Sequence, residues 1–570
     1  MIRRLLFLAI VLAAAFAAAP RRWLPSALAP AQDALLGASA YREPPASEPI
    51  DVRDVEPPCA NEHPEWREEQ VIEGVTIERS PVCEPDNPYF IAAVVKGTSN
   101  VSMDTLMRAG MAPDAVVKEN DRDGDGDPDD VHIKLEVVEL NGRSPDTLEL
   151  LLQYPIAPGI SPGFWVFAPK GFGMATRSLE DLRANPLYRV PSPVIRVEQG
   201  DTVSITLENT HYLPHTIHFH GVDHPYHFHL DPSDLKTRVG NDGVPETDEM
   251  AVMPGESHTY VFTPRQPGTK FYHCHVQPQA HLLMGLQGIF VVEEGRPNNW
   301  VETLNPGAGH VRHSSVAVRE QYEREYDLHY MDLDKSLHEL VQQANDPRLI
   351  ARAINRTYNI AHRVASYFLL NGRSFPFTFR ESLVVVKPDQ KVKLRVLNGG
   401  LSLISLHPHG QALTETHLDG IEVPPAAQVT RDVVAIAAAQ RVDLLLDTTN
   451  DGLHSYGDGV WLFHDHNEHA FTTDGVSPGG HISAIAYESY LDATGWPITH
   501  GIDWRPFFSP DYYRRKIPVW VTYDDMRMLG EAGSVTPSPR QVVARMLLAG
   551  LLLGMLGAAF VRPKRRRPRL

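Results

Sequence analysis

The feature that most constrains the fold is a series of short segments, from about residue 150 onward, in which apolar and polar residues alternate. In SPVIRVEQGDTVSITLEN two such segments are separated by a Gly-Asp turn. Alternation with a period of two is typical of strands with one buried face. A comparable series begins near residue 315, includes LVVVKPDQKVKLRVLNGG, and ends near residue 490. We therefore expect an all-β protein of two Greek-key β-sandwich domains, residues 146–300 and 301–490, related as a distant internal repeat.

Three further regions lie around these domains. Residues 60–145 are predicted to form an N-terminal extra region. Residues 333–364 have a helical pattern and are expected as an insertion in the second domain. Residues 491–541 are aromatic and irregular, so we expect them to wrap the second domain or act as a linker. The 40 glycines and 47 prolines suit such a turn-rich β protein.

Both ends of the chain carry membrane signals. Residues 1–19 have Arg3 and Arg4, then an apolar run and small residues, which indicates a signal peptide. An uncleaved anchor is the alternative, and the arginine pair leaves either Sec or twin-arginine export open. Residues 20–60 are predicted to be a linker. Residues 542–561 are long and apolar enough for a transmembrane helix. The basic tail 562–570 should stay cytoplasmic, which places the catalytic body outside the cell membrane. A sorting signal that is later cleaved stays open for this segment.

Charge and cysteine content narrow the function classes. The formal net charge of −18 disfavours nucleic acid as a partner. Two of the three cysteines, Cys59 and Cys83, lie close together and are predicted to form a disulfide in an exported chain. Cys274 stands between two histidines, a setting that favours a metal.

An acidic segment, NDRDGDGDPDD, resembles the first half of a calcium-binding loop. Asp121, Asp123 and Asp125 have the required spacing. The twelfth loop position is His132 where glutamate is usual. The sequence therefore leaves open either a calcium site or a solvated acidic loop.

Four histidine motifs carry the chemistry. They are HTIHFHG, HCH, HPHG and HDH, one early and one late in each domain, with their histidines at 215, 218 and 220, at 273 and 275, at 407 and 409, and at 464 and 466. Residues two apart on a strand share a face. His273 and His275 should therefore face away from Cys274, and His215 should join the cysteine side. Cys274, His215 and a later histidine would make the His₂Cys set of a blue-copper site.

These motifs resemble the four signatures of the multicopper oxidases, over roughly residues 150–490. The resemblance implies cupredoxin-like domains and about four copper ions per chain. It implies that one-electron oxidation of a reducing substrate is coupled to reduction of dioxygen, through Cys274, His273 and His275. The ligands it implies are His215, Cys274 and His281 for type 1 copper; His218 and His407 for type 2; and His220, His273, His275, His409, His464 and His466 for the type 3 pair.

The order of the motifs departs from the usual pattern, because HCH lies in the first domain. This resembles two-domain oxidases with type 1 copper in the first domain, whose trinuclear site lies between subunits of a homotrimer. The reductant stays open among phenols and ferrous, manganous and cuprous ions. Asp242, Asp465 and Glu468 are candidate proton donors by sequence proximity alone. His224, His227 and His229 are either solvated loop residues, a further metal site or part of a substrate approach.

Two other functions stay open at this stage. A copper nitrite reductase would carry aspartate where His218 stands and would have no ligand histidine at His275. A non-catalytic cupredoxin scaffold would be expected to have lost ligands, and none of the expected ligands is missing.

The axial position of the type 1 site gives a test. The family spacing points to Leu286, whereas Met284 is the competing candidate and is otherwise core packing. A missing axial thioether favours reduced copper, so we expect a high potential. Leu286→Met should lower the potential measured by redox titration, and Met284→Leu should barely change the potential or the spectrum. If Met284→Leu strongly shifts both the potential and the spectrum, Met284 is the axial ligand.

Overall fold

The computed structural model describes four short strands between residues 65 and 82, and residues 112–516 except 113, 123–127, 144–148, 172–187, 296–303, 306–308, 312–321, 345, 494 and 502–503. The chain divides into a unit of residues 43–513 and a second unit, residues 1–42 with 514–570, which lies almost wholly outside the described part. The predicted signal peptide, linker, Cys59–Cys83 disulfide, transmembrane helix and tail also lie outside it. Within the described residues, no helix is long and apolar enough to cross a membrane.

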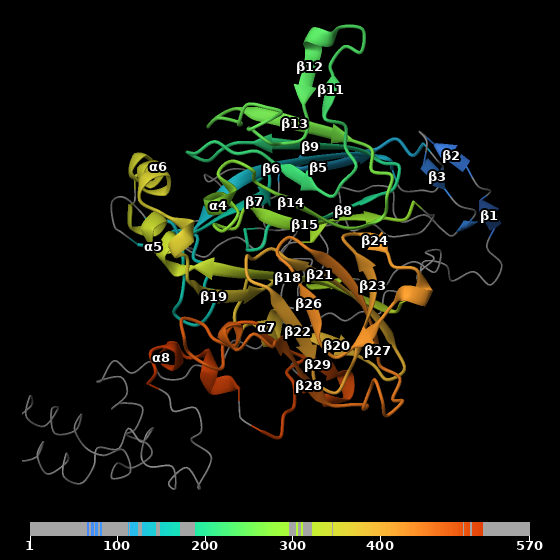
Figure 1. Cartoon of the computed structure of the whole chain (residues 1–570), viewed down its shortest axis with the longest axis vertical. Coiled ribbons are helices and arrows are strands. Elements are labelled where there is room, and N and C mark those ends of the chain that lie inside the picture. Colours follow the sequence, from blue (N-terminus) through green and yellow to red (C-terminus); the bar gives the residue numbers. More distant parts are fainter. Residues whose placement is uncertain are drawn as a thin grey trace, which may run out of the picture. The chain divides into compact units, whose positions relative to one another are not determined.

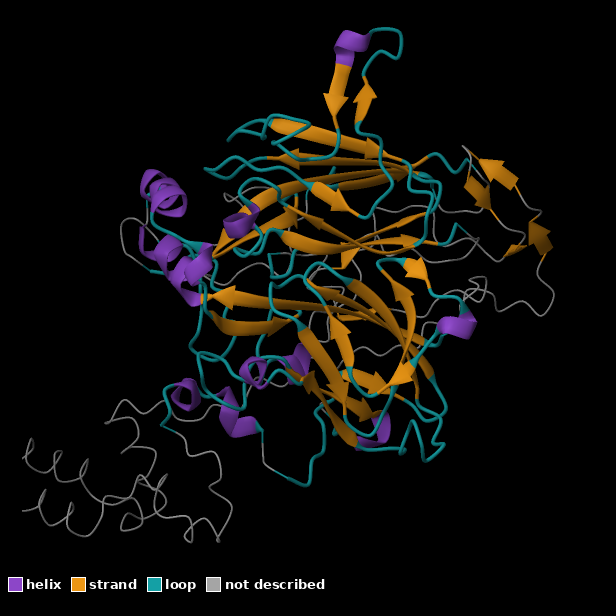
Figure 2. Ribbon diagram, in the orientation of Figure 1, coloured by secondary structure: helices purple, strands orange, loops and turns teal. Residues whose placement is uncertain are grey.

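The first sandwich consists of two sheets (Figures 1 and 2). One sheet has the order β10-β14-β15-β8-β16 and the other has the order β13-β9-β6-β5, with β7 paired to β6. Alternate residues of β6 and β9 are buried, as the period-two pattern predicts. The bounds are β5 Val116–Glu119, β6 Asp130–Leu140, β7 Phe164–Pro169, β8 Val194–Glu198, β9 Thr202–Glu208, β10 His218–His220, β13 Ser257–Phe262, β14 Gly268–His273, β15 Gln287–Glu293 and β16 Leu304–Asn305.

Two strands correct the expected domain boundary. Strands β5 and β6 lie in residues 60–145, the segment predicted to be an extra region, yet β6 pairs with both β7 and β9 of the first sandwich. The alternating run VHIKLEVVEL of β6 supplies Val131, Ile133 and Leu135 to the core of that sandwich. Of the predicted calcium ligands, Asp121 precedes β6 on an exposed loop, and Asp123 and Asp125 lie outside the described residues.

The second sandwich repeats the two-sheet plan. One sheet has the order β17-β18-β21-β27-β23-β24, with β19 paired to β18 and β25 to β23, and the other has the order β20-β29-β28-β22-β26. The bounds are β17 Gly309–Val311, β18 Arg324–Asp334, β19 Ala365–Leu370, β20 Val384–Val386, β21 Lys391–Asn398, β22 Ile404–Pro408, β23 Leu413–Leu418, β24 Ile421–Glu422, β25 Thr430–Arg431, β26 Val434–Ile436, β27 Arg441–Asp447, β28 Val460–Asp465 and β29 Ile482–Tyr487. The all-β fold class is confirmed, with few helices.

Helices and short elements complete the described chain. The remaining strands are β1 Glu65–Arg67, β2 Gln70–Ile72, β3 Val75–Ile77, β4 Ser80–Val82, β11 His227–His229 and β12 Arg238–Gly240. The helices are α4 Pro278–His281, α5 Lys335–Ala344, α6 Pro347–Arg356, α7 Thr378–Glu381 and α8 Pro510–Tyr513, with short 3₁₀ turns at Leu235–Thr237, Ile360–His362, Pro425–Ala427, Glu468–Phe471, Glu488–Tyr490 and Arg505–Phe508.

Helices α5 and α6 occupy the segment 333–364, for which the sequence predicted a helical insertion. Their buried residues Leu337, Val341, Ile350 and Ile354 belong to the core of the first sandwich, although the insertion interrupts the second. The Asp346 side chain accepts a hydrogen bond from Arg348 N and caps α6. The insertion therefore extends the first sandwich, a placement that the local sequence does not reveal.

A buried ionic network joins the two sandwiches. Arg196 of β8 lies with its Nη2 2.6 Å from both carboxylate oxygens of Asp327 in β18. Arg395 of β21 contacts Glu325, and its Nη2 lies 3.4 Å from Glu293 of β15. All of these side chains are nearly inaccessible to solvent. Burial of charge is costly unless each charge is paired, so the network fixes how these two sheets meet.

Removing one member of the network should therefore destabilise the protein. Arg196→Met would leave Asp327 buried and unpaired, at a cost of about 3–5 kcal/mol in the free energy of unfolding. The matched control is Arg265→Met, because Arg265 pairs with Asp223 at 2.8 Å but is 63% exposed, and an exposed pair contributes less than about 1 kcal/mol. Denaturant titration of both variants measures the difference. Equal unfolding midpoints for Arg196→Met and Arg265→Met would contradict a stabilising role for the buried network.

Candidate metal centres

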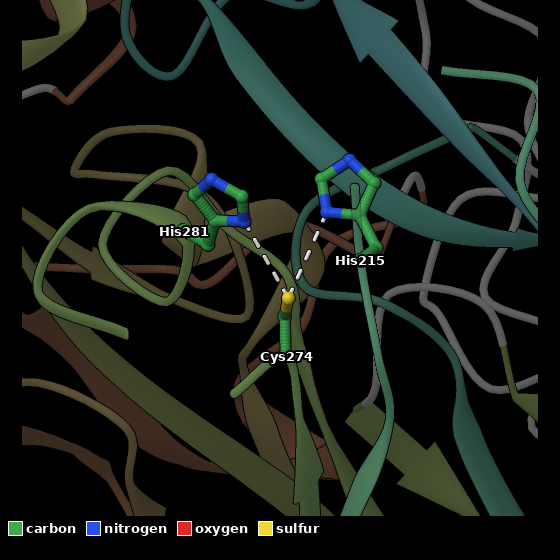
Figure 3. A group of neighbouring side chains, drawn as sticks. All are labelled: His215, Cys274 and His281. Carbon is green, nitrogen blue, oxygen red and sulfur yellow. Dashed lines mark hydrogen bonds between the residues drawn. The ribbon is translucent and has the colours of Figure 1, made fainter. Parts of the chain in front are cut away.

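A buried group of one cysteine and two histidines lies at the end of β14. Cys274 follows the last residue of that strand, and its amide donates to Leu286 O at 3.0 Å. His215 is held by a bridge to Val252, and His281 is the last residue of α4. The Cys274 Sγ lies 3.7 Å from His215 Nδ1 and 3.5 Å from His281 Nδ1, so both rings face the sulfur (Figure 3).

The surroundings of this group favour a metal. Cys274 and His215 have no exposed surface, and the Trp165 ring packs against His281 at 5.3 Å between centroids. Burial raises the pKa of Cys274 to about 12 and lowers the pKa of His281 to about 3. The imidazoles are therefore neutral ligands, whereas a thiolate here would require a cation. A soft thiolate with two imidazoles is the donor set that copper prefers, so the residues fit copper.

A histidine group lies on the other face of the same strands. The β10–β14 register places His218 opposite His273, and His220 lies two residues beyond His218 on the same face. Nitrogen atoms of these three histidines lie within 4.8 Å of one another. His275 is adjacent, with its ring centroid 5.8 Å from that of His273. The two candidate metal centres therefore lie back to back across the His273–Cys274 peptide.

Backbone carbonyls orient two of these rings. His218 Nδ1 lies 2.8 Å from Asp242 O, and His273 Nδ1 lies 3.1 Å from Cys274 O. Each hydrogen bond places the proton on Nδ1 and leaves Nε2 as the ligand atom. The loop that carries Asp242 can approach β10 because Gly243 has no side chain. A Cβ at that position would lie only 2.0 Å from Ile217 O.

The second sandwich holds an equivalent group. His407 of β22 lies opposite His464 of β28. His407 Nδ1 lies 2.7 Å from Asp432 O, and His464 Nδ1 lies 3.0 Å from Asp465 O, which repeats the pattern of His218 and His273. His409 Nε2 is 3.2 Å from His464 Nε2. The ring of His466 lies 5.4 Å from that of His464.

The two histidine groups are separate within one chain. Among the described residues, every group of three or more side chains that could hold a metal ion lies in the first sandwich, and none combines histidines of both sandwiches. His409 and His466 are exposed, and His218, His220 and His275 are half-buried. Each group is therefore accessible from outside its own sandwich.

The remaining predicted residues fall into distinct settings. Asp242 Oδ1 lies 3.2 Å from His218 and 3.4 Å from His224, so His224 joins the edge of the first histidine group. His227 and His229 lie on the β11–β12 hairpin, which projects from the first sandwich in Figure 1.

The other two candidate proton donors differ in burial. Asp465 is buried and accepts from Ser405 N and Asn467 N, whereas Glu468 is exposed and lies 3.3 Å from His466 Nδ1. The two axial candidates, Leu286 and Met284, are both fully buried.

Sequence reasoning missed three residues beside the cysteine group. Trp165 packs on it, His211 lies 2.8 Å from His215 Nε2, and Glu139 lies 3.7 Å from His211 Nε2. The spacing HYLPH, with a histidine four residues before His215, was the one available signal for His211. No pattern in the sequence points to Trp165 or Glu139, which come from other strands.

The two sandwiches with these donor groups have the residues that a copper protein requires. Residues 188–297 match the family model described as multicopper oxidase. Copper resistance protein A of Escherichia coli is 24% identical over 273 residues, which make up 45% of this chain and 42% of that protein. Iron transport multicopper oxidase FET3 of Saccharomyces cerevisiae is 25% identical over 350 residues, 60% of this chain and 46% of that protein.

The chain is therefore similar to the multicopper oxidase family, over residues 188–297 by the family model and over about half of its length by these relatives. It spans less than half the length of the curated relatives named above. Among solved structures, a blue copper oxidase from Nitrosomonas europaea is similar, with 23% identity, a TM-score of 0.46, and coverage of 67% of this chain and 92% of that chain.

Proposed function

We propose that this protein is an exported multicopper oxidase that couples one-electron oxidation of a phenol or metal ion to the four-electron reduction of dioxygen to water. The observation that carries the proposal is the back-to-back arrangement at β14. There a buried His₂Cys group and a group of strand-borne histidines share the His273–Cys274 peptide. Anchoring of the chain by a helix at 542–561, with its body outside the cell, is part of the proposal.

The ligand roles are those that the resemblance to the multicopper oxidases implies, and the donor groups of the structure support them. His215, Cys274 and His281 would hold type 1 copper, and Leu286 is the residue that the family spacing gives for the axial position. His218 and His407, whose Nδ1 atoms each meet the carbonyl of an aspartate, would hold type 2 copper. The type 3 pair takes the remaining six, His220, His273, His275, His409, His464 and His466. This gives about four copper ions per chain. A calcium ion at the Asp121 loop is a separate proposal that rests on the sequence pattern alone.

Copper supplies one-electron redox chemistry to these sites when bound. The chain's own residues supply geometry. Burial of Cys274 excludes water from the sulfur, and the backbone of 273–275 gives a short covalent path from the sulfur to His273 and His275. The carbonyls that hold His218 and His273 keep the Nε2 atoms directed outward and raise their basicity. Asp242 and Glu468, each in contact with a histidine of these groups, are placed to deliver protons.

A homotrimer is the assembly that we propose. Two histidine groups that are each accessible from outside their own sandwich can make one cluster only if they meet, and a head-to-tail ring of chains brings unlike faces together. Exposed apolar residues near the second group support this, since Leu403 and Val433 directly precede β22 and β26 and are 54% and 37% exposed.

Copper nitrite reductase is the second candidate function. The presence of His218 and His275 in the histidine group favours the oxidase. Nitrite turnover without oxygen uptake would decide for the reductase. A non-catalytic scaffold would bind no copper, so metal analysis of the purified protein separates it from both enzymes.

The blue-copper assignment is tested by Cys274→Ser. The variant should lose the intense red-absorbing thiolate band and nearly all oxygen uptake, because a hydroxyl is not a comparable ligand for copper. Copper analysis should show that the histidine-bound ions stay. A retained blue band would refute this role for Cys274.

Assembly is tested by complementation between chains. His273→Ala should abolish the first histidine group, and His464→Ala the second, so each variant alone should be inactive. Co-expression should restore roughly a quarter of the clusters, since intact halves meet in one pairing of four in a random head-to-tail ring. The control is a mixture of the two variants purified separately and not refolded. Absence of recovery, with an active monomer by mass measurement, would show that the cluster forms within one chain.

A further inference from the structure

His211 connects the cysteine group to a cavity. Its Nδ1 lies 2.8 Å from Nε2 of His215, on the side of that ring away from the sulfur, because His215 Nδ1 is the atom that faces Cys274. The His211 ring packs in a tilted arrangement against Tyr212, at 3.9 Å between centroids, and lies 5.1 Å from the Trp165 ring. These two contacts restrict the orientation of the imidazole.

The hydrogen-bonding atoms determine which ring nitrogen of His215 and of His211 carries the proton. When His215 uses Nδ1 as a ligand, its proton stands on Nε2, and His215 donates to His211 Nδ1. The proton of His211 is then on its own Nε2. Within the described part of the chain, that buried nitrogen has no hydrogen-bond partner, and Glu139 Oε2 is 3.7 Å away. His211 therefore presents an N–H to the space beside Glu139.

That space is a cavity of about 540 Å³. His211, Glu139 and Tyr212 line it, together with the charged residues Glu136, Arg143 and Asp346. The aliphatic part of its wall comes from Val137, Leu151, Leu152, Val341, Pro347 and Ile350. Cavities of this size with apolar walls and a few directed polar groups are typical small-molecule sites. Aliphatic walls suit an aromatic ring, and the Glu139 carboxylate suits a hydroxyl or amine donor on it.

The helical insertion supplies one wall of this cavity. Val341 and Gln342 belong to α5, and Pro347 and Ile350 to α6. His338 Nδ1 lies 2.6 Å from Gly163 O, and Gln342 Nε2 donates to Asn141 O at 2.9 Å, so α5 is fastened to loops of the first sandwich. The insertion is thereby fixed beside the cysteine group.

We propose that this cavity binds the reducing substrate, a phenol or aromatic amine, and that His211 relays its electron to the type 1 site. The inference rests on the proposed function and narrows its substrate class. A bound phenol loses one electron and one proton. The electron would pass through His211 and His215 to copper held by His215, Cys274 and His281, which would act as the one-electron acceptor, and the proton would pass to the Glu139 carboxylate. The phenoxyl radical leaves, and dioxygen remains the final oxidant.

Two substitutions of His211 separate the relay from the hydrogen bond. His211→Phe keeps a ring but removes the acceptor for His215 Nε2, which lowers the basicity of that ligand and should raise the type 1 potential. Despite the greater driving force, anaerobic bleaching of the blue band by 2,6-dimethoxyphenol should slow about tenfold. His211→Asn keeps an acceptor near the Nδ1 position, so the potential should stay close to that of the original chain while bleaching still slows.

Filling the cavity tests the substrate site without touching the ligands. Leu151→Trp should raise the 2,6-dimethoxyphenol concentration for half-maximal oxygen uptake about tenfold, with the blue band and bleaching by dithionite unchanged. The matched control is Ile421→Trp, an exposed aliphatic side chain that lines a different cavity. It should leave every value unchanged.

The outcomes separate the inference from the proposed function. If the original chain has no blue band or no oxygen uptake, the proposed function fails. Suppose that the original chain has both. An unchanged bleaching rate in His211→Phe, together with an unchanged half-saturating phenol concentration in Leu151→Trp, would then overturn only the inference. Equal losses in Leu151→Trp and Ile421→Trp would also overturn it.

Discussion

Both candidate metal centres depend on one property of extended backbone, namely that neighbouring residues point to opposite faces. At the end of β14 this sends Cys274 into the first sandwich, toward His215 and His281, and His273 outward, opposite His218. A one-residue shift of register would exchange the two faces and remove both donor sets at once. The pairing of β14 with β10 and β15 is therefore the constraint on which the chemistry rests.

The two sandwiches present equivalent histidine groups, built in the same way. In each, two histidines face each other across an antiparallel pair, one Nδ1 meets the carbonyl of an aspartate, and the other Nδ1 meets the carbonyl of the next residue in the chain. This similarity supports an internal repeat. Only the first group has a cysteine behind it, so in the proposed function electrons would enter the pair from the first sandwich.

Two kinds of contact fix the surroundings of the centres. Arg196, Asp327 and their buried neighbours set how one sheet of each sandwich meets the other. Helices α5 and α6, inserted in the second sandwich, complete the core of the first and form a wall of the cavity beside His211. The chain thus uses a segment of one domain to shape the environment of a site in the other.

The sequence by itself determined the fold class and showed the histidine motifs, because period-two alternation and HxH spacing act within a few residues of the chain. It did not determine that β5 and β6 belong to the first sandwich, since pairing of β6 with β9 joins strands far apart in sequence. It also gave no sign of Glu139 or Trp165, and only a faint one of His211. These side chains meet the cysteine group through sheet packing, and contacts across a core depend on the tertiary structure rather than on local pattern.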